Sequence, residues 1–289
     1  MSIIQVNNLT KKYNDFTAVN HISFEVEKGT MLGFLGVNGA GKTTVINMLA
    51  TLLTPNEGSV QICGETLGKG NREIRKKIGI VYQQNCLDDI LTVRENLICR
   101  GILHGASKTE AQAQCQRLSE ILKLEEILKK KYRTLSGGQK RRAEIAAALM
   151  HTPELLFLDE PTTGLDPATR KDVWNIIEEL RKNEKMTVFL TTHYMEEAAG
   201  ADKIIIMDHG NIITQGTPFT LKEKFARDRL RLIYKTGKEE EISLFATLEA
   251  LPLVHAAEGK LKGFEVIQGN MDDVFLNAVG RTLLEEERI

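Results

Sequence analysis

The sequence contains no apolar run long enough to cross a bilayer. A membrane-spanning helix needs about 20 predominantly apolar residues, and no stretch of the 289 residues approaches that length. The first residues, MSIIQVNNLTKKY, also lack the apolar core of a signal peptide. We therefore expect that any membrane role of this protein is performed from the water side.

Cysteine is scarce, and its spacing indicates no shared site. The four cysteines, Cys63, Cys86, Cys99 and Cys115, form no C-x-x-C pair. This pattern predicts neither a zinc site nor a disulfide framework. It is typical of a reduced, cytosolic protein.

The chain also lacks an excess of charge of either sign. It has 38 Lys and Arg against 39 Asp and Glu, a formal net charge of −1. This balance argues against wholesale binding to nucleic acid or to an anionic membrane, although local basic patches occur at residues 129–131 and 140–142. No internal repeat or low-complexity segment is present, and the length predicts one large domain with an appendage.

Short apolar runs rich in β-branched residues alternate with segments that have a helical sequence pattern. The runs occupy residues 22–26, 31–36, 60–63, 78–82, 155–159, 187–192, 203–208 and 211–214, with helical stretches at 42–53 and 168–183. This alternation predicts an α/β fold with a buried, mostly parallel sheet flanked by helices. The first run and the last two look like antiparallel additions.

Two segments depart from this alternation. Residues 84–149 contain no convincing strand and predict an inserted helical subdomain, because the stretch is too long for a loop. After Pro218 come short alternating runs and a final helix with Asn270 as its N-cap. We therefore predict a main domain at residues 1–217 and a small α+β appendage at 218–289.

A phosphate-binding loop follows the second apolar run. The sequence GVNGAGKTT at 36–44 fits G-x-x-x-x-G-K-[ST], in which glycines let backbone N–H groups surround phosphate oxygens. Lys42 would reach the β- and γ-phosphates, and the Thr43 hydroxyl would face Mg²⁺. The predicted nucleotide contacts are Gly36, Asn38, Gly39, Ala40, Gly41, Lys42, Thr43 and Thr44.

An acidic pair follows the buried run LLFLD at 155–159. Asp159, at the carboxyl end of a strand, is placed to hold the metal ion of a phosphate-loop nucleotidase. The adjacent Glu160 would orient or deprotonate the attacking water. Alone, such a pair is more often a turn or a helix cap, but the phosphate loop favours the catalytic role.

Three further side chains lie in or beside predicted strands. His193 and Gln83 each follow a buried run and are expected at the same sheet edge, with Gln84 as an alternative to Gln83. Tyr13 could stack on a purine base or could be an ordinary strand aromatic. The residues alone leave these roles open.

A second anion cradle occurs in the helical segment. Residues 134–149 read TLSGGQKRRAEIAAAL, with Ser136, Gly137, Gly138 and Gln139 directly before an apolar helical pattern. Free N–H groups at a helix start attract anions.

Over residues 1–217 the chain resembles the nucleotide-binding subunit of an ABC transporter. The resemblance lies in the order and spacing of Tyr13, GVNGAGKT, Gln83, LSGGQ, LDE, GLD and His193. LSGGQ together with a phosphate loop is highly specific for that family. The segments at 78–97, 192–198 and 271–280 are similar to exporter ATPases of the drug-resistance and nodulation (lipo-oligosaccharide) type.

The resemblance implies an ATPase that binds ATP and Mg²⁺, the metal contacting Thr43, Gln83 and Asp159. Two such subunits face each other head to tail, as a homodimer or with a related chain, and Ser136, Gly137, Gly138 and Gln139 of one cover the γ-phosphate held by the other. Asp166 is then expected at the subunit interface, and His193 senses the γ-phosphate. A separate membrane permease carries the substrate, so the subunit is peripheral on the cytoplasmic face. The basic run after LSGGQ is normal for the family, which makes nucleic-acid binding there a poor hypothesis.

Two positions depart from the usual pattern, and three other functions compete. One of the three, a non-hydrolysing regulatory cassette, is disfavoured by the intact Glu160 and His193. Val37 stands where proline is common, and Ala147 replaces an arginine in the helix after LSGGQ. An importer ATPase has identical motifs, and only the subgroup resemblance separates it from an exporter. Soluble ABC ATPases that act on DNA or ribosomes usually show two cassettes, a long coiled coil or zinc cysteines, none of which is present.

Overall fold

The computed structural model describes the backbone of residues 1–286 and the side chains of residues 1–183 and 185–280. The last residues of the predicted appendage, 287–289, lie outside this described part. The chain divides into two compact units, one formed by Met1–His193 with Met207–Asn211 and the other by Tyr194–Ile206 with Ile212–Ile289.

A parallel sheet forms the centre of the first unit. Its strands β3 (Met31–Leu35), β8 (Thr187–Thr192), β7 (Leu155–Asp159) and β6 (Ile78–Val81) pair side by side in that order, all parallel. Every residue of β3, β7 and β8 is buried. Because parallel strands end at the same edge, the residues that follow these four strands are brought close together.

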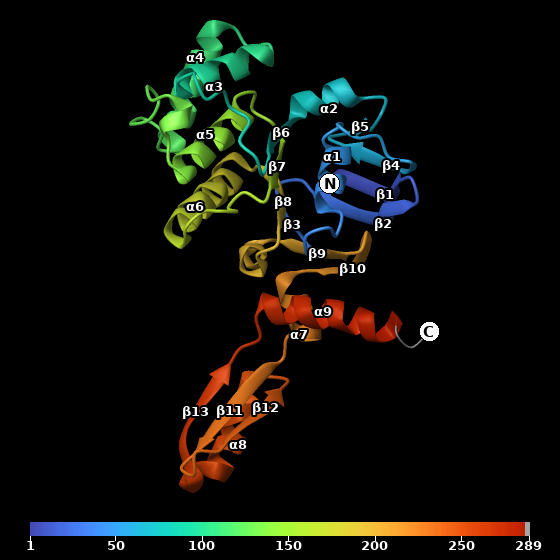
Figure 1. Cartoon of the computed structure of the whole chain (residues 1–289), viewed down its shortest axis with the longest axis vertical. Helices are drawn as coiled ribbons and strands as arrows, with labels where there is room; N and C mark the ends of the chain where they lie inside the picture. The colour runs from blue at the N-terminus through green and yellow to red at the C-terminus, as the bar shows by residue number, and fades with distance from the viewer. Residues whose placement is uncertain (287–289) are drawn as a thin grey trace. The chain divides into compact units, whose positions relative to one another are not determined.

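An antiparallel sheet accompanies it, in the order β2-β1-β4-β5. The strands are β1 (Ser2–Tyr13), β2 (Phe16–Glu27), β4 (Glu57–Ile62) and β5 (Glu65–Thr66). The predicted antiparallel position of residues 22–26 is therefore confirmed, although β1 and β5 were not foreseen. Figure 1 shows this sheet on one side of the parallel strands and helices α3 to α6 on the other.

Between Val81 and Leu155 the described chain contains no strand, as the sequence predicts. The helices are α3 (Val93–Leu103), α4 (Lys108–Ile121) and α5 (Gly137–Leu149). Each begins with a reciprocal capping box, formed by Thr92 with Glu95, Ser107 with Glu110 and Ser136 with Gln139. These side chains satisfy the free N–H groups of the first turn, which explains where the helices start.

Three more helices belong to this unit: α1 (Lys42–Leu49), α2 (Asn71–Lys77) and α6 (Pro167–Glu184). The helix predicted at 42–53 is shorter than expected, ending at Leu49, and Thr51 has a positive φ of 65°. Helix α6 begins at the N-cap Asp166 and matches the prediction to within one residue at each end.

The second unit includes the 3-10 helix η2 (Met195–Gly200), the α-helices α7 (Pro218–Phe225) and α9 (Met271–Glu286), and a three-stranded antiparallel sheet. The sheet has the order β12-β11-β13, from Glu239–Leu244, Asp228–Tyr234 and Leu261–Ile267. Helix α8 (Ala250–Ala257) covers one face, where Leu230, Leu232, Leu244 and Ala250 form a small core. Asn270 caps α9 as predicted, its Oδ1 accepting from the Asp273 N–H at 2.9 Å.

Strands β9 (Lys203–Asp208) and β10 (Asn211–Gly216) are joined by His209 and Gly210, and the division between the units passes through them. Both connecting residues have positive φ, 43° and 80°. This is the two-residue turn of a tight antiparallel hairpin, as expected for residues 203–214. Among the described residues, no helix combines the length and apolarity required to cross a membrane.

Candidate functional site

The phosphate loop connects β3 to α1 at the carboxyl edge of the parallel sheet. Gly39 and Gly41 have φ of +88° and +105°, which side chains rarely tolerate. A Cβ on Gly41 would lie 2.5 Å from the Ala18 carbonyl oxygen, and one on Gly36 2.4 Å from that of Met207. The glycines are therefore required by backbone geometry and by close packing.

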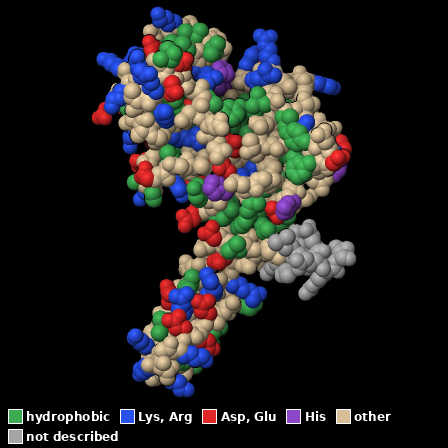
Figure 2. All heavy atoms as spheres, viewed as in Figure 1, with side chains coloured by type: hydrophobic (Ala, Val, Ile, Leu, Met, Phe, Trp, Pro, Cys, Tyr) green, Lys and Arg blue, Asp and Glu red, His purple; other side chains and the backbone are tan. Residues whose placement is uncertain are grey.

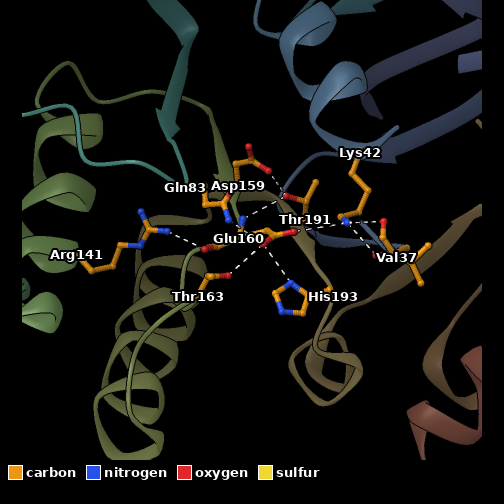
Figure 3. A network of polar contacts seen from close by, with 10 residues as sticks. Val37, Lys42, Gln83, Arg141, Asp159, Glu160, Thr163, Thr191 and His193 are labelled. Carbon is orange, nitrogen blue, oxygen red and sulfur yellow. Dashed lines mark hydrogen bonds and ion pairs between the residues drawn. The ribbon is translucent and has the colours of Figure 1, made fainter. Parts of the chain in front are cut away.

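Lys42 is the first residue of α1 and is 5% exposed. Its ammonium donates to the carbonyl oxygens of Gly36 at 2.8 Å and Val37 at 3.1 Å, and lies 3.6 Å from Glu160 Oε1 (Figure 3). Burial lowers the pKa of Lys42, and the neighbouring Glu160 carboxylate opposes that shift. The loop thus holds a desolvated cation at its mouth, where phosphate charge would be neutralised.

Asp159 ends β7 and is also buried. Its Oδ1 accepts a 2.6 Å hydrogen bond from the Thr191 hydroxyl, which belongs to the paired position on β8. Burial raises the pKa of Asp159, and the Thr191 hydrogen bond works in the opposite direction.

Glu160, the next residue, has a φ of +46°, in the left-handed region that non-glycine residues rarely adopt. Its N–H donates to the Thr191 carbonyl oxygen at 3.0 Å. This conformation turns the Glu160 side chain out of the strand path.

The Glu160 carboxylate is the meeting point of the site. Its Oε2 accepts from Gln83 Nε2 at 3.3 Å and from the Thr163 hydroxyl at 3.1 Å, and lies 3.1 Å from His193 Nδ1 (Figure 3). The ends of three strands, β6, β7 and β8, and the phosphate loop that follows β3 therefore contribute to one cluster. Gln83, rather than Gln84, makes this contact.

A cavity of about 670 Å³ opens beside the cluster. Its lining residues are Tyr13, Phe16, Ala18, Asn38, Gly39, Gly41, Lys42, Thr43, Thr44, Gln83, Glu160, Thr163 and His193. Pockets of a few hundred to about 1,000 Å³ are typical of sites for small molecules and cofactors. The Tyr13 ring, 47% exposed, lies at the wall of this cavity rather than in the core.

The chemistry of the lining fits a nucleotide with a magnesium ion. Thr43 and Gln83 offer a hydroxyl and an amide oxygen, and the Asp159 carboxylate lies directly before Glu160 in the chain. Mg²⁺ commonly uses one or two carboxylates and completes its shell with water and substrate phosphates. The described residues contain no group of three or more His, Cys, Asp or Glu able to hold a metal, and a magnesium site of this kind does not need one.

The second anion cradle lies elsewhere. Of the described residues that line the cavity, none comes from Ser136–Gln139. Ser136 is exposed and caps α5, its hydroxyl accepting from the Gln139 N–H at 3.4 Å. Gly137 and Gly138 follow it at the start of α5.

Asp166 serves a local purpose within the subunit. It caps α6, accepting from the N–H groups of Ala168 and Thr169 and from the Thr169 hydroxyl at 2.5 Å. The hydrogen bonds from Thr169 hold the pKa of Asp166 below its usual range. A Cβ on Gly138 would lie 2.2 Å from Thr169 Cγ2, so α5 and α6 approach closely there.

Sequence reasoning missed three residues of this site: Thr163, Thr191 and Arg141. Thr191 belongs to a strand predicted to be buried, two residues before His193. A buried hydroxyl needs a hydrogen-bond partner, and that is the signal that could have identified Thr191. Arg141 was included only in a basic run, yet it is 5% exposed and donates to the Glu160 carbonyl oxygen at 2.8 Å. No local pattern marks it as buried.

Comparisons with known proteins agree with this geometry. The family model for the ABC transporter matches residues 19–163. The linearmycin resistance ATP-binding protein LnrL of Bacillus subtilis is 36% identical over 97% of this chain and 99% of its own. A Nod factor export ATP-binding protein I, from Burkholderia orbicola, is 37% identical over 97% and 98%. The daunorubicin/doxorubicin resistance ATP-binding protein DrrA of Streptomyces peucetius is 41% identical over 79% and 69%.

Solved structures show the same similarity. CbiO1 of Clostridium perfringens, part of the ABC transporter complex cbiONQ, superposes with a TM-score of 0.71 at 28% identity, covering 76% of this chain and 90% of that one. The dimeric cassette MJ0796 bound to ADP and Pi gives a TM-score of 0.68 at 28% identity, covering 74% and 98%. The predicted phosphate-loop fold class is thereby confirmed.

Proposed function

We propose that this chain, which belongs to the ABC transporter family and is an ATP-hydrolysing subunit of a transporter, binds MgATP in the cavity beside Lys42 and hydrolyses it within a closed dimer. The observation that carries the proposal is the Glu160 carboxylate, which Lys42, Gln83, Thr163 and His193 surround within 3.6 Å. Such a carboxylate, fixed at the edge of a phosphate site, is placed to accept a proton from water.

Each residue then has a distinct role. Lys42 and the loop N–H groups neutralise the triphosphate, with Tyr13 stacking on the base. Thr43, Gln83 and Asp159 would hold Mg²⁺, which would neutralise phosphate charge when bound. Glu160 orients the attacking water and takes its proton, and His193 contacts the γ-phosphate.

A second copy, or a related chain, completes the site. Ser136, Gly137 and Gly138 offer N–H groups and a hydroxyl at the start of α5, yet do not line the cavity among the described residues. We assign them to the ATP of the opposing subunit in a head-to-tail dimer; the similar cassette MJ0796 is itself dimeric. Thr169, which approaches Gly138 of this segment, is hydrogen-bonded to Asp166, so Asp166 would adjoin that interface.

The transport step belongs to a separate membrane permease, on whose cytoplasmic side this subunit sits. The relatives covering nearly the whole chain are named for resistance and for Nod factor export, which favours export over import. Residues 1–217 form the nucleotide-binding domain in this proposal, with the helical subdomain at 84–149, and residues 218–289 form the accessory domain.

The decisive experiment measures ATP-driven dimerisation in a Glu160→Gln background. That variant retains the cavity and ATP but loses the base, so ATP should convert it from monomer to dimer in sedimentation experiments. Adding Ser136→Arg should abolish the dimer while the monomer keeps its affinity for ATP, because the arginine obstructs only the opposing site.

Ser107→Arg is the matched control. Ser107 is another exposed N-cap serine with a capping box, on α4, and each replacement loses a cap worth about 1 kcal/mol. Only the Ser136 change should prevent dimerisation. A Ser136→Arg monomer that fails to bind ATP, or a Glu160→Gln protein that stays monomeric with ATP, contradicts the proposal.

A further inference from the structure

Helix α5 carries two charged side chains that are almost completely buried. Arg141 is 5% exposed and Glu144 is 6% exposed, and at a spacing of three they share one face of the helix. Burying a charge is costly unless it is fully paired and hydrogen-bonded. The partners of these two residues therefore indicate what the helix is built to hold.

Arg141 donates its hydrogen bonds to main-chain carbonyl oxygens at the ends of two strands. Its guanidinium donates to the carbonyl oxygen of Glu160 at 2.8 Å (Figure 3). It also donates to those of Tyr82 at 2.6 Å and of Pro161. Tyr82 immediately precedes Gln83, and Glu160 is the proposed base. One side chain thus ties α5 to the backbone of both catalytic segments.

Glu144 holds the other end of the Gln83 segment. Its Oε1 accepts from the N–H groups of Cys86 at 2.7 Å and Leu87 at 3.0 Å, and from the Tyr132 hydroxyl at 2.8 Å. Residues 82–87 are consequently fastened to α5 on both sides of Gln83.

The backbone of Glu160 needs such support. Its positive φ of 46° is an unfavourable conformation for a side-chain-bearing residue. Its N–H is fixed by the Thr191 carbonyl oxygen on β8, and its own carbonyl by Arg141 on α5. Removal of Arg141 would free the carbonyl side of this residue and let the carboxylate shift.

We propose that Arg141 and Glu144 are positioning residues that link the helix behind Ser136 to Gln83 and Glu160. When the opposing nucleotide engages the start of α5, the displacement of the helix is passed through Arg141 to both strand ends and through Glu144 to residues 86–87. Closure on the partner's ATP and alignment of the subunit's own catalytic carboxylate thereby become one event. The inference rests on the proposed roles of Gln83, Glu160 and Ser136.

The test compares Arg141→Met and Arg141→Lys with Arg142→Met. Arg142 is the next residue on α5 and also donates to carbonyl oxygens, those of Lys123 at 2.9 Å and Leu122 at 3.5 Å, but contacts neither strand end. Misplacement of a catalytic group by about 1 Å can cost up to about a hundredfold in rate. We expect Arg141→Met to lower kcat at least about tenfold with the Kd for ATP changed less than about twofold, Arg141→Lys to retain part of kcat, and Arg142→Met to retain nearly all of it.

Hydrogen exchange supplies a readout independent of turnover. In Arg141→Met and in Glu144→Leu, the amides of residues 83–87 should exchange faster than in the wild type, at temperatures where melting curves show both proteins folded. Glu144→Gln retains an acceptor oxygen and should restore protection. Should Arg141→Met fail to fold, Arg141→Lys and the Glu144 pair carry the same comparison.

The outcomes separate this inference from the function on which it rests. Full hydrolysis by Glu160→Gln overturns the proposed base, whatever Arg141 does. The inference alone is overturned if Glu160→Gln loses hydrolysis but folded Arg141→Met has a kcat within about twofold of that of Arg142→Met. It is also overturned if Glu160→Gln loses hydrolysis but hydrogen exchange at residues 83–87 is unchanged in Arg141→Met.

Discussion

Lys42 and Arg231 are both cations held by carboxylates, but their surroundings differ. The Lys42 side chain is 4% exposed, with the Glu160 side chain at 10%. Arg231, in the three-stranded sheet, is 36% exposed and pairs across strands with Glu241 at 2.9 Å and Glu265 at 3.2 Å. Burial lowers the pKa of Lys42, whereas the hydrogen bond to Glu241 raises that of Arg231.

The rest of the two regions follows the same contrast. Around the phosphate cavity, Asp159, Glu160 and Arg141 are all buried, and each is held by hydrogen bonds. Over the three-stranded sheet, charges of both signs lie on the surface (Figure 2). Exposed ion pairs contribute little to stability, whereas buried charge is retained where chemistry needs it. Charge in the first region therefore marks function, and in the second it is mainly a solvated face.

The largest difference in kcat between the two regions is expected from matched replacements of two glutamates. Glu160→Gln should lower kcat by about a hundredfold or more, because the amide cannot take a proton from water. Glu241→Gln removes an exposed carboxylate from Arg231 and should leave kcat and the melting temperature unchanged within error. Steady-state hydrolysis and thermal denaturation of the two variants decide the matter, and a Glu241 effect on kcat would give the sheet a role in turnover.

A smaller effect is expected where α5 meets α6. Gly138→Ala should destabilise the protein by about 1–3 kcal/mol, because the new methyl group would overlap Thr169 Cγ2, whose hydroxyl is bonded to Asp166. Thr169→Ser keeps that hydroxyl and deletes Cγ2, so the double variant should recover the lost stability in denaturant titrations.

Gly263→Ala provides the comparison in the other region. An added Cβ there would meet no atom within 4 Å among the described residues, so little change is expected. Destabilisation of Gly138→Ala that persists with Thr169→Ser would show that the contact is not the cause.

A separate effect concerns acid stability. His151 Nε2–H donates to the Ile78 carbonyl oxygen at 2.8 Å, and the ring stacks on that of His104 at 3.9 Å, with Arg100 nearby. Burial lowers the pKa of His151 from 6.5 to about 4. The unfolded chain therefore binds more protons between those values, and stability that is complete above pH 6.5 is lost as the pH falls toward 4, by at most about 1.4 kcal/mol per pH unit.

His151→Gln can still donate to Ile78 and has no such titration. The loss of melting temperature between pH 7 and pH 5 should be smaller in this variant than in the wild type. Equal losses in the two proteins would assign the acid sensitivity to other groups.

Much of the site was predictable because its parts are local. A short apolar run leads to each part of the site: the phosphate loop, the Asp159–Glu160 pair, Gln83 and His193. The ends of parallel strands then meet at one edge of the sheet. Helix starts at 107 and 136 carry their own capping residues. The less regular elements, β1, β5 and α2, have weaker patterns and were missed.

The amino-acid sequence by itself determined the alternation of strands and helices and the residue types at the strand ends, since periodicity, caps and turns act within a few residues. The tertiary structure alone decided which distant groups meet: Arg141 reaches Tyr82 across 59 residues, and Thr191 reaches Asp159 across 32. It also decided that Ser136–Gln139 lie outside the lining of their own phosphate cavity, as far as the described residues extend. Such contacts depend on how complete elements pack, because a buried donor must find its acceptor wherever the fold brings one within about 3 Å.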